Sequence, residues 1–158
     1  MIYIGVDPGL TGGVAFIVPE LIAVSYDMPT FAYSVTGAVK RAVDCNALSK
    51  LIRDCCPDLE AGRLFIERVN AFPGQGVSSM FSLGMSFWGV VGVAAGLGIP
   101  VELVEPRAWK KHFGLGPDKD QARGLASRLY PSVDLSKKKD HGRAEALLIA
   151  RYGMERLK

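Results

Sequence analysis

Residues 2–13 have the sequence IYIGVDPGLTGG, and they predict how the sheet of this protein begins. The apolar, β-branched run 2–6 is typical of a buried strand, and the turn residues at 7–9 end it. Two more short apolar runs, 14–18 and 21–26, follow after brief links. Because short links join antiparallel strands, we expect these three strands to form an antiparallel meander.

Downstream of the meander, helical and strand patterns alternate. Residues 27–45 are ambiguous, and we expect a loop there that leads into a helix near 46–55. The further expected elements are a strand at 63–67, a long helix at 77–99, a strand at 101–104, and helices near 107–113, 118–130 and 140–154. This mixture predicts an α/β fold with a mixed sheet.

Length and composition narrow the class of protein. A chain of 158 residues suits one domain spanning 1–158, and 49% apolar with 22% charged residues excludes a disordered chain, a collagen and a coiled coil. Three cysteines are too few for a disulfide scaffold and lack zinc-site spacing, so we expect reduced thiols. The N-terminus lacks the basic and apolar regions of a signal peptide, which favours the cytoplasm.

Charge is distributed unevenly along the chain. Residues 1–102 contain six basic and nine acidic side chains, whereas residues 103–158 contain 13 basic and seven acidic ones. A basic C-terminal third suggests a polyanionic partner, nucleic acid first. The alternative is an ordinary solvated, lysine-rich surface.

The predicted helix at 77–99 lies in a stretch, 71–101, without any charged residue. It is long enough to span a bilayer. Its flanks lack lysine-rich anchors and its serines recur every four residues, so we expect a buried helix and no membrane partner. Its glycines would allow the sheet or a second subunit to approach closely.

Four acidic residues occupy positions that are typical of a site. Asp7 and Glu67 end predicted strands, and Asp140 and Glu145 stand at the start of the last helix. Ligand sites in α/β folds gather where strands end and helices begin. Clustered carboxylates repel one another, and a hard divalent cation relieves that repulsion. Each acid also has an ordinary alternative, as a turn residue, a solvated side chain or a helix cap.

Three segments together resemble a known family. IGVDPGLTGG at 4–13, LFIERV at 64–69 and DHGRAEALLIA at 140–150 resemble the RuvC-type Holliday junction resolvases, and especially their short phage and prophage members. These proteins belong to the ribonuclease-H-like nucleases. The resemblance runs from Ile2 to about Tyr152. It implies a mixed five-stranded sheet flanked by helices, four metal-binding positions and two Mg²⁺ ions, for which Mn²⁺ is a possible substitute.

The resemblance assigns roles to the acids residue by residue. Asp7 and Glu67 match the acids that end the first strand and the strand before the long helix, and Glu145 matches the last acid. The family usually places an acid or a histidine three residues before that last acid, where this chain has Gly142. We therefore expect Asp140 to be the third catalytic and metal-binding residue, with His141 as the alternative or as a general base.

The basic and aromatic residues near these acids are candidates for DNA contacts. The resemblance implies lysines close to the scissile phosphate, and phosphate contacts give salt-dependent affinity. An aromatic residue near the acids could stack on an exposed base or simply pack in the core. The DNA-binding candidates are Lys110, Lys111, Lys119, Phe72, Lys138 and Arg143. We expect Trp109 only to pack a short helix onto the sheet.

These features predict a metal-dependent crossover junction endodeoxyribonuclease. It would resolve four-way DNA junctions by paired nicks that leave 5′-phosphate and 3′-hydroxyl ends. Because such a junction is two-fold symmetric, we expect a homodimer joined through the uncharged helix, in a bacterial or phage-infected cell. The alternatives are an RNA-processing nuclease of the same fold and a catalytically silent DNA-binding module. A third is an ATP-using protein of the actin-like type, because DPGLTGG resembles the phosphate loop of those proteins.

Overall fold

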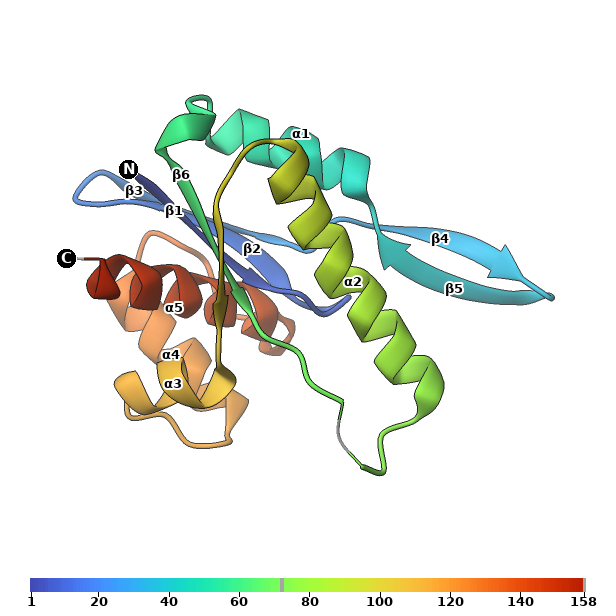
Figure 1. The fold of residues 1–158 in the computed structure, drawn as a ribbon. Helices are drawn as coiled ribbons and strands as arrows, with labels where there is room; N and C mark the ends of the chain where they lie inside the picture. Colours follow the sequence, from blue (N-terminus) through green and yellow to red (C-terminus); the bar gives the residue numbers. More distant parts are fainter. Residues whose placement is uncertain (72, 158) are drawn as a thin grey trace.

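The computed structural model describes residues 1–71 and 73–157. A mixed five-stranded sheet with the order β3-β2-β1-β6-β7 forms its centre (Figure 1). The first three strands pair antiparallel, which confirms the predicted meander, and β1, β6 and β7 run parallel. The strand bounds are Ile2–Asp7 for β1, Gly13–Val18 for β2, Ile22–Asp27 for β3, Gly62–Glu67 for β6 and Val101–Val104 for β7.

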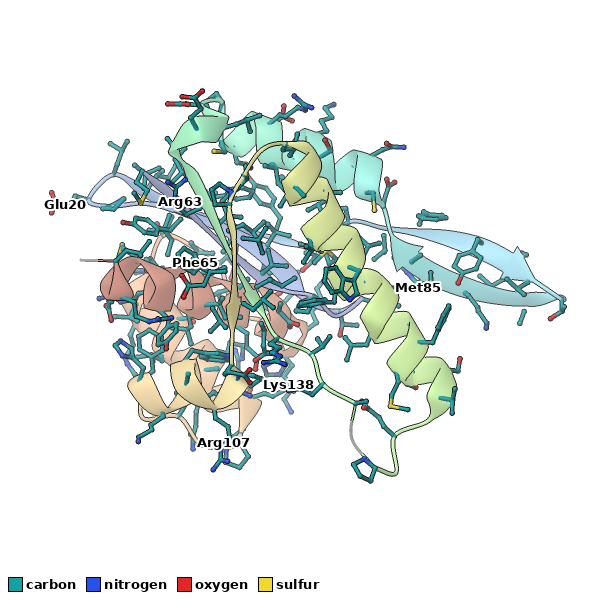
Figure 2. The ribbon with its side chains drawn as sticks, viewed as in Figure 1. Glu20, Arg63, Phe65, Met85, Arg107 and Lys138 are labelled. Carbon is teal, nitrogen blue, oxygen red and sulfur yellow. The ribbon has the colours of Figure 1, made fainter. Side chains whose placement is uncertain are left out.

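Helices cover both faces of this sheet (Figure 1). One face carries α5, together with α3 and α4, and the other carries α1 and α2. Tyr3 and Phe65 point to the α5 face, and Phe65 is seen on that side in Figure 2. Ile4 and Leu64 point to the opposite face. The helix bounds are Cys45–Cys55 for α1, Val77–Gly96 for α2, Pro106–His112 for α3, Lys119–Leu129 for α4 and His141–Arg156 for α5, with short 3₁₀ turns η1 at Leu59–Ala61 and η2 at Lys138–Asp140.

Glycines allow α5 to lie directly against β1 and β2. A Cβ atom at Gly5 would stand 2.0 Å from the carbonyl oxygen of Ala146, and one at Gly13 would stand 2.8 Å from the backbone of Arg143. A β-bridge between Gly12 and Gly142 continues the contact. The beginning of α5 is therefore held at the end of β1 that carries Asp7.

Residues 27–45 were predicted as a loop, and this prediction is wrong for most of the segment. A separate two-stranded hairpin forms there, with β4 at Thr30–Val35 and β5 at Ala38–Val43. Thr36 and Gly37 connect the strands with φ values of 47° and 81°. Two successive positive φ angles are the geometry of the tight hairpin turns that match strand twist. The hairpin projects beside α2 (Figure 1).

The buried-helix prediction for 77–99 is right for one side of α2 only. Ser86, Phe87, Val90 and Ala94 are buried, and the last three pack in the core. By length and composition α2 could also cross a membrane, a property that buried helices share. Its other side exposes large apolar side chains. We call these the apolar stripe of α2, made of Val77, Phe81, Met85 and Trp88.

Candidate active site

The carboxyl ends of β1 and β6 bring Asp7 and Glu67 to the same edge of the sheet. Val6 pairs with Ile66 in the parallel register, so Asp7 and Glu67 occupy the next positions of adjacent strands. Side chains alternate between faces along a strand. Asp7 and Glu67 therefore share the α5 face with Tyr3 and Phe65. The sequence placed these two acids at strand ends, and the structure brings them together.

Glu145 reaches the same place from the second turn of α5, and it is 8% exposed. Burial raises its pKa, the charges of Asp7 and Glu67 raise it further, and its value is about 7. Burial also raises the pKa of Asp7, although the Gly9 N–H donates to Asp7 Oδ1 at 3.2 Å. These three carboxylates, which we call the acid cluster, therefore act on one another electrostatically.

Trp109 has a role that the sequence analysis missed. Its side chain is fully buried, as expected for packing, but its indole Nε1–H also donates to Glu67 Oε1 at 2.9 Å. Burial raises the pKa of Glu67, and this hydrogen bond opposes the rise. A buried indole usually needs an acceptor, which was the available signal. The bond fixes the direction in which Glu67 points.

Two of the predicted lysines lie near the acid cluster. The positive charges of Lys110 and Lys119 lower the pKa of all three carboxylates. Lys110 Nζ also lies 5.2 Å from the centre of the Trp109 ring. Lys111, on α3, and Lys138, in η2, are exposed. Phe72 lies outside the described residues.

Asp140 is buried but is not part of the acid cluster. It accepts a hydrogen bond from the Lys137 N–H at 2.9 Å, and its Oδ1 pairs with Arg143 Nη2 at 2.8 Å. Burial alone would raise its pKa, but these two partners lower it. Its carboxylate is thus used to hold the start of α5, and the structure does not join it to Asp7, Glu67 and Glu145 as the sequence had suggested.

Arg143 is likewise engaged within the protein. Besides Asp140, it lies 3.5 Å from Asp27 and donates to the carbonyl oxygen of Asp134 at 2.8 Å. These contacts connect the end of β3 with the segment that precedes η2. In this structure Arg143 therefore braces these segments, and its predicted phosphate contact stays a prediction.

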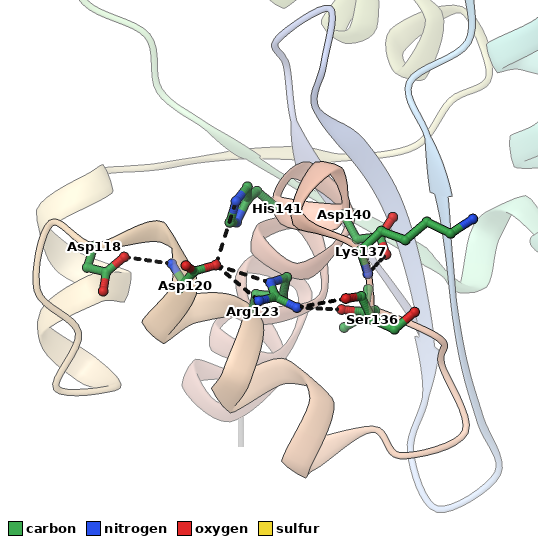
Figure 3. A network of polar contacts seen from close by, with 8 residues as sticks. Asp118, Asp120, Arg123, Ser136, Lys137, Asp140 and His141 are labelled. Atoms are coloured by element: carbon green, nitrogen blue, oxygen red, sulfur yellow. Dashed lines mark hydrogen bonds and ion pairs between the residues drawn. The ribbon is translucent and has the colours of Figure 1, made fainter.

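His141 is the first residue of α5, so it stands four residues before Glu145 on the same helix face. Its Nε2 lies 3.9 Å from Asp120 Oδ1 (Figure 3). Its Nδ1 is buried and has no hydrogen-bond partner among the described residues. Asp120 was not predicted, although Asp118 caps α4 as expected by accepting from the Asp120 N–H. Of the two alternatives for the third position, Asp140 has both oxygens paired, whereas His141 has one ring nitrogen without a hydrogen-bond partner among the described residues.

The acid cluster does not form a closed metal shell in this structure. Within residues 1–71 and 73–157, no three His, Cys, Asp or Glu side chains converge closely enough to hold an ion. Like charges repel, Glu67 is directed toward Trp109, and Asp7 toward Gly9. Charges shift one another's pKa over longer distances than a metal–ligand bond spans. The raised pKa values are therefore compatible with the open arrangement of the three carboxylates. Buried carboxylates with raised pKa values are donors that suit a hard divalent cation.

Of three comparisons with known proteins, two found similar chains and one found none. No family model matches the chain. A curated relative, the chloroplastic Holliday junction resolvase MOC1 of Chlamydomonas reinhardtii, is 34% identical over 94 residues, which is 57% of this chain and only 11% of the relative.

Solved structures match over nearly the full chain. One is Thermus thermophilus RuvC in complex with a Holliday junction substrate, with a TM-score of 0.62, 17% identity, and coverage of 99% of this chain and 96% of that one. Another Thermus thermophilus RuvC structure has a TM-score of 0.60 and 16% identity with the same coverage. The chain thus resembles the RuvC-type resolvases in sequence over part of its length, and it has their ribonuclease-H-like fold.

Proposed function

We propose that this chain is a metal-dependent endonuclease that cuts four-way DNA junctions. The observation that carries the proposal is the acid cluster of Asp7, Glu67 and Glu145, flanked by Lys110 and Lys119, on a RuvC fold. The names of the relatives support the substrate, since one is a Holliday junction resolvase and a RuvC structure contains the junction. We also propose that residues 1–158 act as one nuclease domain in the cytoplasm of a bacterial or phage-infected cell.

The acid cluster would hold the metal, with His141 as a fourth ligand in place of Asp140. We propose that these residues would hold two Mg²⁺ ions, replaceable by Mn²⁺. Two divalent cations would stabilise negative charge at the phosphodiester and lower the pKa of bound water toward about 7. The products would be 5′-phosphate and 3′-hydroxyl ends.

The remaining residues of the site position the substrate and the ligands. Lys110 and Lys119 place positive charge beside the acids, where it attracts the DNA phosphate. Trp109 holds Glu67 through its indole N–H. The free Nδ1 of His141 can accept a proton where it is not used as a ligand. Lys111 and Lys138, both exposed, would add phosphate contacts farther from the acids.

We further propose that the chain is a homodimer joined through Val77 and Trp88, the two members of the apolar stripe of α2 that do not line the cavity between α2 and the β4–β5 hairpin. Val77 and Trp88 are 79% and 67% exposed, and large exposed apolar patches mark interaction surfaces. A two-fold dimer would present two acid clusters to the two strands of a symmetric junction.

The test is cleavage of a labelled synthetic four-way junction, beside a linear duplex and a single-stranded RNA, in Mg²⁺ and in EDTA. We expect paired nicks in the junction alone, only with metal, and none with Asp7→Asn. Asp54→Asn is the matched control, because Asp54 is exposed on α1, which covers the opposite face of the sheet. Cleavage of RNA alone, cleavage in EDTA, or wild-type cleavage by Asp7→Asn would each overturn the proposal.

A further inference from the structure

The β4–β5 hairpin leaves the sheet at the same edge as the acid cluster. Asp7 pairs with Gly13, and Gly13 pairs with Asp27 at the end of β3. The hairpin follows directly, and its base is fixed by hydrogen bonds from the Met28 N–H to the Gly12 carbonyl and from the Asp44 N–H to the Pro29 carbonyl. Its position beside the site is therefore set by the sheet register.

A groove of about 680 Å³ lies between this hairpin and the first half of α2. We call it the hairpin groove. Met85 projects from α2 on the side that faces the hairpin (Figure 2). The hairpin groove is also lined by the aromatic Phe31, Tyr33 and Phe81, the basic Lys40, and the hydroxyl-bearing Ser78. Sites of this volume hold ligands of a few rings, such as one or two nucleotides.

The hairpin groove is positively charged. The two hairpin strands contain Lys40 and Arg41 and no acid, and α2 contains no charge at all. The one acidic side chain among the described lining residues is Asp44. Its Oδ1 accepts the Ala47 N–H at 2.9 Å and so caps α1. The net positive charge of these lining residues complements an anionic ligand.

Aromatic rings stand next to the positive charge. Phe31 is 47% exposed, and its ring centre lies 5.9 Å from that of Tyr33. Tyr33 pairs with Lys40 across the hairpin, and residues directly opposite one another share a face. Aromatic rings that stack bases, beside cations that hold phosphates, are the surface that binds unpaired nucleotides.

The hairpin groove also borders the turn that follows Asp7. Leu10 lines it and also lines a smaller cavity of about 290 Å³ that is bordered by Thr11, Arg41 and Lys139. Leu10 and Thr11 belong to the turn that follows Asp7. This turn therefore borders both the hairpin groove and the smaller cavity.

We propose that the hairpin groove binds unpaired nucleotides of the branched substrate, with Phe31 and Tyr33 stacking on bases and Lys40 holding a phosphate. Arg41, which donates to the Thr30 hydroxyl, would contribute charge at the base of the hairpin. The proposal rests on the proposed function for its substrate. Its binding step, however, needs neither metal nor cleavage.

The test is the fluorescence anisotropy of a labelled ten-nucleotide oligo(dT) with the full chain in EDTA. Stacking is worth about 1–3 kcal/mol per base. We therefore expect Phe31→Ala with Tyr33→Ala to weaken binding by roughly tenfold or more. Lys40→Ala should reduce the slope of log affinity against log salt concentration by about 0.7, the contribution of one phosphate contact on a single strand. The controls are Val39→Ala, on the opposite face of the hairpin, and Lys50→Ala, an exposed lysine on α1; neither should change binding.

The outcomes of this test distinguish the proposal for the hairpin groove from the proposed nuclease function. Loss of oligo(dT) affinity in the aromatic variant, with an unchanged melting temperature, supports the groove even if the wild type cuts no junction. Unchanged affinity overturns it, even if the wild type cuts junctions. Light scattering gives a further arm: if the aromatic variant converts a dimer to a monomer while affinity per chain is unchanged, the groove holds a second copy and the proposal is wrong.

Discussion

Replacing Glu145 with Gln should stabilise the metal-free protein above neutral pH. The side chain is 8% exposed, and its pKa is raised from 4.5 to about 7 by burial and by the charges of Asp7 and Glu67. Near pH 4 the carboxyl is protonated in both the folded and the unfolded states, so it carries no electrostatic cost. Between pH 4.5 and about 7 the unfolded state releases this proton while the folded state keeps it, so the free energy of unfolding falls over this range and is constant above it.

The size of this effect follows from the pKa difference. At about 1.4 kcal/mol per pKa unit, the shift corresponds to about 3 kcal/mol once the pH is well above 7. For a chain of this length that is roughly 6–12 °C in melting temperature. We expect Glu145→Gln to melt higher than the wild type by this amount at pH 8.5 in EDTA, and to match it near pH 4.5. Saturating Mg²⁺ should stabilise the wild type more than the variant.

The measurement is thermal unfolding followed by circular dichroism at both pH values. Glu60→Gln, an exposed acid on η1, is the control and should show no difference that depends on pH. A Glu145→Gln variant that is less stable than the wild type at pH 8.5, or that differs equally at both values, would refute the reasoning.

Three more predictions follow from contacts in the site. Trp109→Phe keeps an aromatic ring but removes the bond to Glu67 and leaves a cavity, so cleavage should need a higher Mg²⁺ concentration and the melting temperature should fall. An unchanged Mg²⁺ titration would contradict this. Gly5→Ala should lower the free energy of unfolding, measured in urea, by about 3 kcal/mol or more, because its Cβ would stand 2.0 Å from a carbonyl oxygen. Gly92→Ala has open space around it and should raise that free energy by about 0.5–1 kcal/mol. Asp140→Asn should lower stability at pH 7 but not near pH 2, because a carboxylate with a lowered pKa stabilises the fold only where it is ionised. His141→Ala should instead reduce the rate of cleavage. A rate loss confined to Asp140→Asn would reverse this assignment.

Much of the fold could be predicted because its signals are local. The meander and the strand that ends at Glu67 follow from short apolar runs with turn residues beside them. The hairpin was missed because its strands mix small, polar and apolar residues and pair only with each other, although Thr36-Gly37 between two alternating runs was a usable turn signal.

The acid cluster was predictable only in part. Strand ends and helix starts pointed to Asp7, Glu67 and Glu145. The bond between Trp109 and Glu67 joins residues 42 positions apart, and it depends on the parallel register of β6 and β7, which no local pattern encodes. The internal partners of Asp140 could not be predicted, because a carboxylate at a helix start has several competing partners. Here Arg143, three residues later, pairs with it.

The contact between Trp109 and Glu67 gives the protein an optical reporter of its own site. The chain contains two tryptophans, and the other, Trp88, is 67% exposed on α2. In a Trp88→Phe variant, all indole emission would come from a ring whose N–H is bonded to a carboxylate of the acid cluster. Any ion that draws Glu67 away from this N–H changes the surroundings of the emitting ring. Loading of the site can thus be followed by fluorescence in solution, without DNA and without a label.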